Sequence, residues 1–341
     1  MSQLLNLPPA EWPAWFKERG VPAFQGRNAA RWVFQRGATD WQDMTDLPAG
    51  LRDDLALDAP LLSSTAETES GAKDGAVKTL IRYPDGASVE AVHMPGTAGH
   101  TICLSTQVGC PVKCQFCASG LDGLERNLTA GEILEQALWL RHRYGSFDRV
   151  VVMGMGDAGF NLDATLQALD ALMAPEGFGM AARRLTLSTV APAGCLPQFA
   201  AWGRQVKLAL SLHATTDALR HELIPGVAKR SIAETLREAD AVFEATGREY
   251  TVEYVLLAGV NDSLSQADEL RRLLHGRRCF VNLIPYNPVS GLGFRRPEGS
   301  HCQAFADLLE KSGLPVKLRL SLGRSADAAC GQLRRRKAEQ G

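Results

Sequence analysis

Three cysteines, Cys110, Cys114 and Cys117, lie within eight residues and form the densest group of metal-ligating side chains in the sequence. Three thiolates from one short loop can hold three irons of a cubane 4Fe-4S cluster, whereas a structural zinc site usually closes its tetrahedron with four protein ligands. A zinc knuckle would need His100 or Cys103 as a fourth ligand, and three unrelated buried thiols are the remaining alternative. The spacing favours a cluster whose fourth iron stays open to another ligand.

Small and polar residues stand at the ends of several short apolar runs further along the chain. Gly154 and Gly156 follow one such run, and a residue without Cβ lets the backbone approach a ligand closely. The polar residues in comparable positions are Asp157, Ser188, Ser211, His213 and Asn287. Each alone would be an ordinary turn, capping or core residue. They predict a binding site only if the fold brings them to one edge.

The apolar runs that these residues follow predict strands. They lie at residues 101–106, 149–154, 184–189, 206–212, 250–257, 279–285 and 315–320, and helical patterns separate most of them. Strands that alternate with helices predict a parallel α/β sheet, either doubly wound or curled into a barrel. Functional groups are then expected at the carboxyl ends of the strands.

Capping-box patterns predict several of the intervening helix starts independently. A Ser or Thr followed three residues later by Glu or Gln satisfies two backbone N–H groups at a helix start. The pairs are Thr129 with Glu132, Ser231 with Glu234, Ser263 with Gln266, and Ser300 with Gln303.

The first hundred residues have a different character. Residues 1–65 contain four of the six Trp and show helical patterns around 9–19, 27–36 and 47–57, which predict a small helical domain. Residues 66–100 contain two strand patterns, 79–83 and 88–92, around the turn residues Pro84, Asp85 and Gly86, which predict a linking β-hairpin. Residues 101–333 would form the catalytic domain, and 334–341 a solvated basic tail.

Composition excludes several classes of protein. The 45% hydrophobic and 22% charged residues are typical of a globular protein and disfavour disorder. Lys+Arg 37 against Asp+Glu 38 leaves a net charge of -1, so any nucleic acid must be bound by local patches rather than a global positive field. Eight Cys without a signal-peptide pattern predict a reducing, cytoplasmic location, and no apolar run predicts a membrane span.

The cysteine triplet resembles the signature of radical S-adenosylmethionine (SAM) enzymes, and more of the sequence resembles the RlmN/Cfr family of RNA methyltransferases. The resemblance extends from about residue 20 to 333. It is carried by residues 89–95, 103–110, 154–157, 187–189, 211–213, 282–288 and 327–333. It implies a partial (β/α) barrel of the radical SAM type, a 4Fe-4S cluster held by the cysteine triplet, and SAM bound to the fourth iron. The positions that match SAM contacts are Gly156, Asp157, Ser188, Ser211, Leu212, His213 and Asn287.

The resemblance also implies three catalytic residues. Adenine C2 and C8 lack a nucleophilic lone pair, so a methyl group cannot reach them by simple displacement from SAM. In the family, the cysteine corresponding to Cys330 accepts a methyl group from one SAM, and a second SAM supplies the radical that activates it. Glu90 corresponds to the general base and Cys103 to the cysteine that forms a transient disulfide with Cys330. Cys195, Cys279 and Cys302 match no family role.

Several aspects of function stay open at this stage. The resemblance implies an RNA substrate, ribosomal or transfer RNA, an electron donor such as flavodoxin, and a monomer. It leaves C2 and C8 of adenine as alternatives. Asp157 and Ser325 depart from the family pattern, which usually has Glu and Asp there, and suggest a divergent member. A radical SAM activase acting on a protein, and a non-catalytic Fe-S protein that binds RNA or senses redox state, are the rival hypotheses.

Overall fold

The computed structural model describes residues 4–97, 99–319, 323 and 327–333. One large sheet runs through it, accompanied by a two-stranded hairpin, β5 (Gln107–Gly109) and β6 (Leu124–Asn127). The strands of the large sheet, in their order of pairing, are β1 (Thr65–Gly71), β2 (Val77–Arg82), β3 (Ser88–Met94), β4 (Thr101–Cys103), β7 (Arg149–Val152), β8 (Leu185–Thr189), β9 (Lys207–Ser211), β10 (Tyr250–Leu256), β11 (Cys279–Pro285) and β12 (Val316–Leu318).

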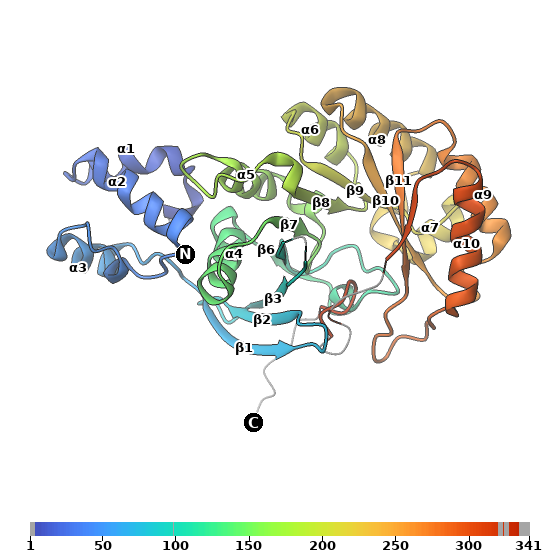
Figure 1. Ribbon diagram of the computed structural model, residues 1–341, viewed down its shortest axis with the longest axis horizontal. Coiled ribbons are helices and arrows are strands. Elements are labelled where there is room, and N and C mark those ends of the chain that lie inside the picture. Colours follow the sequence, from blue (N-terminus) through green and yellow to red (C-terminus); the bar gives the residue numbers. More distant parts are fainter. Residues whose placement is uncertain (1–3, 98, 320–322, 324–326, 334–341) are drawn as a thin grey trace.

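The large sheet changes from antiparallel to parallel at β4. Strands β1 to β4 pair antiparallel, whereas the pairs from β4 to β12 are parallel. β1 and β12 are the edges of the sheet formed by the described residues, so the sheet curves without closing. Figure 1 shows this open curve, which confirms the partial barrel that the resemblance implied.

Helices connect the parallel strands and pack on the outer face of the curve (Figure 1). They are α4 (Ala130–Tyr144), α5 (Leu162–Met173), α6 (Cys195–Trp202), α8 (Ile232–Thr246), α9 (Leu264–Leu274) and α10 (Gly299–Lys311). The short helix α7 (Asp217–Leu223) packs instead against the loop that carries Cys110 and Phe116. Each of the seven predicted strand runs contains one observed strand, which confirms the predicted alternation. The buried apolar side chains between sheet and helices form one continuous core.

Three of the four predicted helix caps are present. Thr129 and Ser263 form complete capping boxes, and the Ser231 side chain accepts a hydrogen bond from the Glu234 N–H. The prediction at Ser300 is wrong. Helix α10 begins at Gly299 because the Cys302 N–H bonds to the carbonyl of Glu298 at 3.0 Å, which leaves Ser300 inside the first turn.

This difference between the caps is testable by mutation. We expect Thr129→Ala to lower the free energy of unfolding by about 1 kcal/mol, because it leaves an N–H of α4 without its partner. The matched change Ser300→Ala should stay within about 0.5 kcal/mol, since Ser300 is exposed and caps nothing. Urea denaturation of the two variants measures both values, and equal losses would contradict the assignment.

The tryptophan-rich segment forms the predicted helical module. Its helices are α1 (Trp12–Glu18), α2 (Ala23–Ala30), which continues into a π-helical segment Arg31–Arg36, and α3 (Ala49–Asp58). Trp12 and Trp41 lie fully buried in a separate small core that Leu138 of α4 joins. The Asn6 side chain accepts a hydrogen bond from the Gly131 N–H at 2.8 Å, so the module packs on the start of α4.

Residues 66–100 differ in part from the predicted linking hairpin. The two predicted strands are present as β2 and β3, but β1 pairs with β2 ahead of them and all three belong to the main sheet. The β1 sequence, Thr-Ala-Glu-Thr-Glu-Ser-Gly, lacks alternating large apolar residues because β1 is an edge strand, so it carries no strand pattern. The segment extends the barrel sheet rather than standing apart from it.

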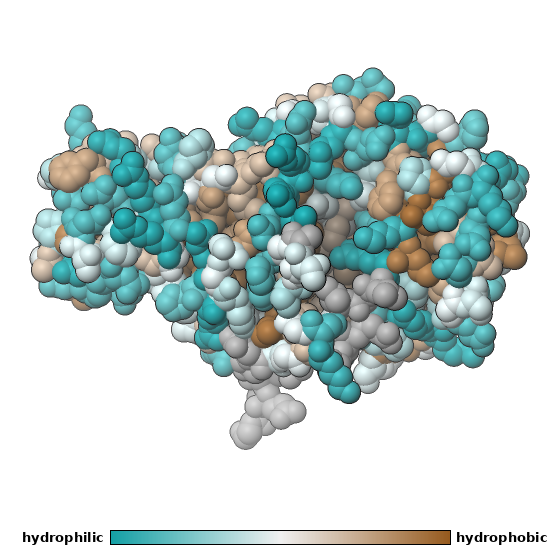
Figure 2. Space-filling model, viewed as in Figure 1, coloured by the Kyte–Doolittle hydropathy of each residue, from teal (hydrophilic) through white to brown (hydrophobic). Residues whose placement is uncertain are grey.

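The surface of the molecule is mainly polar, as expected when the apolar side chains lie between the sheet and the helices. Figure 2 shows a mainly hydrophilic face with scattered apolar patches. None of the helices in the described ranges has the length and apolar character needed to cross a membrane. The predicted basic tail, 334–341, lies outside the described residues.

Candidate active site

The cysteine motif lies on a loop that follows β5. The end of α7 and the residues after it form hydrogen bonds with this loop. The Gly226 N–H donates to the carbonyl of Val112 at 2.9 Å, and the Gln115 N–H donates to that of Leu223 at 3.0 Å. A Cβ at position 226 would lie 2.5 Å from the Val112 Cα, so this approach requires glycine. These contacts fix the path of the loop.

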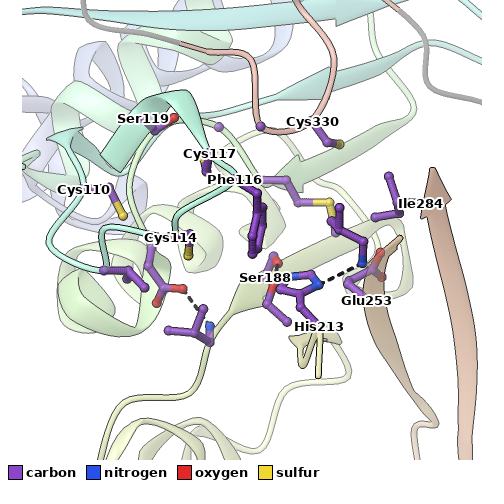
Figure 3. Close-up of a pocket in the computed structure, with 18 of the residues that line it drawn as sticks. Cys110, Cys114, Phe116, Cys117, Ser119, Ser188, His213, Glu253, Ile284 and Cys330 are labelled. Carbon is purple, nitrogen blue, oxygen red and sulfur yellow. Dashed lines mark hydrogen bonds between the residues drawn. The ribbon is translucent and has the colours of Figure 1, made fainter. Parts of the chain in front are cut away.

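The three thiols of the motif, Cys110, Cys114 and Cys117, line one cavity (Figure 3). With its mouth, the cavity has a volume of about 930 Å³, which is large enough for a small-molecule cofactor. Burial raises the pKa of all three thiols, and burial with the nearby Asp157 carboxylate raises the pKa of Cys110 to about 12. The thiols therefore need a cationic partner to become thiolate ligands, and iron would supply it.

These donors fit a cubane better than a single zinc ion. Zinc binds thiolates at about 2.3 Å from one centre, and within the described ranges no three His, Cys, Asp or Glu side chains converge as a set of metal ligands. The two candidates for a fourth ligand lie elsewhere: His100 stacks on His93 with ring centroids 5.2 Å apart, and Cys103 belongs to β4. A cubane distributes three thiolates over three irons and leaves one iron for a ligand from outside the protein.

The cavity opens at the carboxyl ends of the parallel strands, as predicted. Residues from the ends of β7, β8, β9 and β11 line it together because parallel strands end at the same edge. They include Gly156, Asp157, Ser188, Ser211, His213 and Asn287. Leu212 is the exception among the predicted SAM contacts, since its side chain is fully buried in the barrel core.

The Asp157 carboxylate ties the end of β7 to the segment after β8. Oδ1 accepts hydrogen bonds from Thr189 Oγ1 at 2.7 Å and the Gly159 N–H at 2.9 Å, and Oδ2 accepts one from the Val190 N–H at 2.7 Å. Burial raises the pKa of Asp157, although these hydrogen bonds act in the opposite direction. Oδ2 can accept a further bond, for example from a ligand ammonium group.

His213 presents a neutral imidazole to the cavity. Its backbone has a φ of 59°, and its Nδ1 accepts a hydrogen bond from the Val255 N–H at 3.1 Å, so the ring hydrogen resides on Nε2. Burial, together with the Arg220 charge, lowers the pKa of His213 to about 3. The ring therefore remains a neutral N–H donor near pH 7.

The lowered pKa of His213 predicts how stability depends on pH. Between its ordinary pKa of 6.5 and about 3, the unfolded chain binds a proton at this ring that the folded chain does not, so stability falls as pH falls. Each unit of difference corresponds to about 1.4 kcal/mol. His213→Gln should flatten the pH dependence of the unfolding free energy across this window, as urea denaturation at several pH values would measure.

The glycines after β7 are needed by the packing of the chain itself. Gly156 has a φ of +93°, and a Cβ there would lie 2.6 Å from the Gln107 Cβ. A Cβ at Gly154 would lie 2.7 Å from the Leu104 carbonyl oxygen. The backbone at Gly154 and Gly156 therefore packs closely against Leu104 and Gln107, which lie just before the cysteine motif.

We expect Gly156→Ala to lower the free energy of unfolding by roughly 3 kcal/mol, of which about 1 is strain at positive φ and about 2 is overpacking against Gln107. Gly247→Ala is the matched control, because Gly247 also has a positive φ, +66°, but a Cβ there meets open space. That variant should lose about 1 kcal/mol. Chemical denaturation distinguishes the two, and similar losses would argue against the packing role.

Cys330 is held at the same cavity by two other segments. The Ala118 N–H, next to the cysteine motif, donates to the Gly331 carbonyl at 2.8 Å. Asn287 Nδ2, after β11, donates to the Cys330 carbonyl at 3.2 Å. Figure 3 shows the Cys330 side chain across the cavity from the three motif cysteines. A residue 213 positions beyond Cys117 is thus brought beside the predicted cluster.

Cys103 lies behind the cavity wall, near Cys330. Burial and the neighbouring Cys330 thiol raise the pKa of Cys103 to about 12. Both cysteines are free thiols in the structure, and their pairing as a disulfide remains a prediction. The remaining cysteines, Cys195, Cys279 and Cys302, are buried in the barrel core and do not line the cavity.

Glu90 is buried, contrary to the solvated position that composition alone would suggest. It lies on β3 and is 2% exposed, because β3 is an interior strand of the main sheet. Val92, two residues later, pairs with Cys103 of β4, so Glu90 and Cys103 share one face of the sheet. Glu90 does not line the cavity itself.

Comparison with known proteins identifies the family. The radical SAM superfamily profile matches residues 104–274, and that of the ribosomal RNA large subunit methyltransferase N-terminal domain matches residues 2–60. A probable dual-specificity RNA methyltransferase RlmN of Rhodopirellula baltica is 44% identical over 341 residues, which cover 99% of this chain and 92% of that protein. This chain belongs to the RlmN family.

Two further comparisons extend over nearly the whole RlmN-family chain. The probable RlmN of a Synechococcus strain is 41% identical, with 99% of this chain and 98% of that protein covered. The crystal structure of a radical SAM methyltransferase from Sphaerobacter thermophilus has a TM-score of 0.93 at 41% identity and covers 97% of this chain and 98% of that one. The radical SAM fold and the family expected from the sequence are confirmed.

The cavity of this RlmN-family chain also contains residues that the sequence analysis missed. Phe116 projects from the cysteine loop and meets His213 edge-on at a centroid distance of 5.1 Å. Glu253 of β10 and Arg319 after β12 also line the cavity. The position of Phe116 inside the cysteine motif was a usable signal. Glu253 and Arg319 are charged residues inside the predicted strand runs 250–257 and 315–320, whereas the predicted site residues were taken from the ends of such runs.

Two residues, Asp157 and Ser325, depart from the RlmN/Cfr pattern, and the structure describes one of them. Asp157 keeps its carboxylate at the cavity, where it accepts hydrogen bonds from Thr189 and Val190. Ser325 lies outside the described residues.

Proposed function

We propose that this protein methylates a carbon of adenine in RNA, with two SAM molecules per turnover and an S-methyl intermediate on Cys330. The observation that carries the proposal is the placement of Cys330 on the cavity of the cysteine motif. Ser119 Oγ donates to the Leu333 carbonyl at 2.7 Å, and the Ala118 N–H donates to the Gly331 carbonyl. These two hydrogen bonds join the segment after the cysteine motif to the segment that carries Cys330. A radical SAM enzyme that activates another protein has no need of a cysteine at the position of Cys330, in addition to the three of the motif.

The cofactors would be held by residues already described. Cys110, Cys114 and Cys117 would ligate three irons of a 4Fe-4S cluster, and SAM would bind beside it along the strand ends, with Asp157 and His213 among its contacts. Together the bound cofactors supply one-electron chemistry that can activate an unreactive C–H bond. Phe116 lines this cavity and is buried, so it presents an apolar wall to the bound cofactors.

Cys330 would act first as a nucleophile. Its thiolate attacks the sulfonium methyl group of SAM, so an S–CH₃ bond forms on Cys330 while S-adenosylhomocysteine leaves. Arg319 lies near enough for the charge of an ionised Cys330 to raise the pKa of Arg319.

Glu90 and Cys103 would complete the reaction. Once the methyl carbon is joined to the adenine ring, the radical adduct would return one electron to the bound cofactors, and the Glu90 carboxylate takes the ring proton. The Cys103 thiolate then attacks the Cys330 sulfur, so a disulfide forms as the bond from that sulfur to the methylated base breaks and the released carbon takes a proton. A cellular thiol reductant restores both thiols. A reducing cytoplasm suits this cycle.

The substrate is inferred from the relatives and from the N-terminal module. The relatives are named dual-specificity RNA methyltransferases, and the module resembles a domain named for methylation of large-subunit ribosomal RNA. We infer that ribosomal RNA is the main substrate, that transfer RNA is the second, and that residues 1–65 help to bind them. We further infer a monomer and a flavodoxin-like electron donor.

Two measurements test this function together. Nucleoside analysis of RNA from a deletion strain, with and without a restored copy of the gene, should show a methyladenosine that depends on the protein and identify C2 or C8. Mass mapping of the Cys330 peptide should show an added methyl group after expression with SAM. Unchanged RNA together with an unmodified Cys330 would favour a protein activase or a non-catalytic Fe-S protein.

A further inference from the structure

One face of β2, β3 and β4 carries a row of reactive side chains. Lys78 of β2 pairs with Val92 of β3, and Val92 pairs with Cys103 of β4. Directly opposite residues share a face, as do residues two apart along a strand. Lys78, Glu90 and Cys103 therefore all project from the same face of the sheet.

Two of these side chains form a buried ion pair. Lys78 Nζ lies 2.9 Å from Glu90 Oε1, and the two side chains are 5% and 3% exposed. Desolvation largely offsets the attraction in such a pair, so replacing both charges with apolar groups commonly leaves stability unchanged or improved. Stability alone is therefore a weak reason for a buried Lys at this position, and a functional reason is needed.

Lys78 also contacts the segment that carries Cys330. Its Nζ donates to the carbonyl of Asp327 at 3.2 Å, three residues before Cys330. A second contact joins the same hairpin to this segment: the Gly323 N–H donates to Asp74 Oδ2 at 2.8 Å. Lys78 thus connects Glu90 to the Cys330 segment, while Asp74 binds that segment without touching Glu90.

We propose that Lys78 is the positioning residue for proton removal, holding the Glu90 carboxylate ionised and directed at the face shared with Cys103. The inference rests on the proposed function, in which Glu90 takes the ring proton. A base must be ionised to accept a proton, and burial without an opposite charge drives a carboxylate to its neutral form. When Glu90 takes the proton it becomes a neutral acid.

The proposal predicts that the two halves of the reaction separate in a Lys78→Met variant. Methyl transfer to Cys330 should continue at the wild-type level, because it does not use Glu90. RNA methylation should fall by about 10²- to 10⁴-fold, the usual contribution of a general base. Protein joined to RNA through the methyl carbon on Cys330 should accumulate, and deuterium at the target ring carbon should slow the variant more than the wild type.

Asp74→Ala is the matched control for a tethering role. It removes the hydrogen bond from Gly323 to Asp74, a contact between this hairpin and the Cys330 segment, but leaves the ion pair intact. If Lys78 only tethers that segment, both variants should lower Cys330 methylation and RNA methylation in the same proportion, without a covalent adduct or a larger isotope effect. That result for Lys78→Met would overturn the proposal.

Two further variants, Lys78→Gln and Glu90→Gln, test the role of Lys78 even if Lys78→Met does not fold. If Lys78→Met does not fold, Lys78→Gln keeps a hydrogen-bond donor without the charge, and it should show the same separation of the two halves. Wild-type activity in folded Lys78→Gln would refute the role of the charge. Glu90→Gln should reproduce the adduct. If Glu90→Gln is fully active, or if the wild type methylates neither Cys330 nor RNA, the proposed function fails instead.

Discussion

Replacing Cys330 by alanine is expected to abolish RNA methylation, by at least about 10³-fold, because it removes the nucleophile that receives the methyl group. Within the described residues, Cys330 is the one thiol that lines the cavity from outside the cysteine motif. The iron content should stay at the wild-type value, since Cys330 is not a cluster ligand in the proposed site. Nucleoside mass spectrometry and iron analysis on the same preparation measure both results.

Cys302→Ala is the control for this experiment. Cys302 is also a free cysteine, but it belongs to α10, its side chain is buried in the core, and it does not line the cavity. Its replacement should leave RNA methylation unchanged. Normal methylation by the Cys330→Ala protein would rule out the S-methylcysteine mechanism and leave only the family assignment.

The second large effect is expected from removing the cysteine motif. A variant with alanine at Cys110, Cys114 and Cys117 should fall from about four irons per chain to almost none, because these thiols supply the protein ligands of the proposed cubane. RNA methylation should be lost with the iron. Anaerobic purification followed by iron, sulfide and zinc analysis measures the content directly.

The corresponding control is Cys279→Ala, at a buried cysteine that begins β11, at the opposite end of the strand from the cavity. Its iron content should equal that of the wild type. Stoichiometric zinc in wild-type protein prepared without oxygen would contradict the cluster assignment, whatever the activity of the variants.

The repeating part of the fold was predictable from local sequence. Buried parallel strands are short apolar runs, and amphipathic helices separate them, so each of the seven runs contains an observed strand. Failures occurred where local signals are weak. β1 is a polar edge strand without the alternating pattern, and Ser300 has the composition of a cap although α10 begins one residue earlier.

The site was predictable only in part. The cysteine motif is a local pattern, and its chemistry follows from residue type and spacing. Leu212 belongs to a matched family stretch, yet its side chain points into the core. Lys78 carried no signal at all, because a lysine in a strand pattern looks like an ordinary solvated residue. Its burial follows from the position of β2 inside a larger sheet.

The sequence by itself determined the elements and the thiol loop, because helix and strand periodicity and ligand spacing are properties of neighbouring residues. Tertiary structure alone decided which distant groups meet. Cys330 is held at the cavity by two hydrogen bonds, from Asn287 to its own carbonyl and from Ala118 to the carbonyl of Gly331. Glu90 meets Lys78 through the register of two strands. Such contacts depend on how the strands pair and the sheet curves, and no local pattern records either.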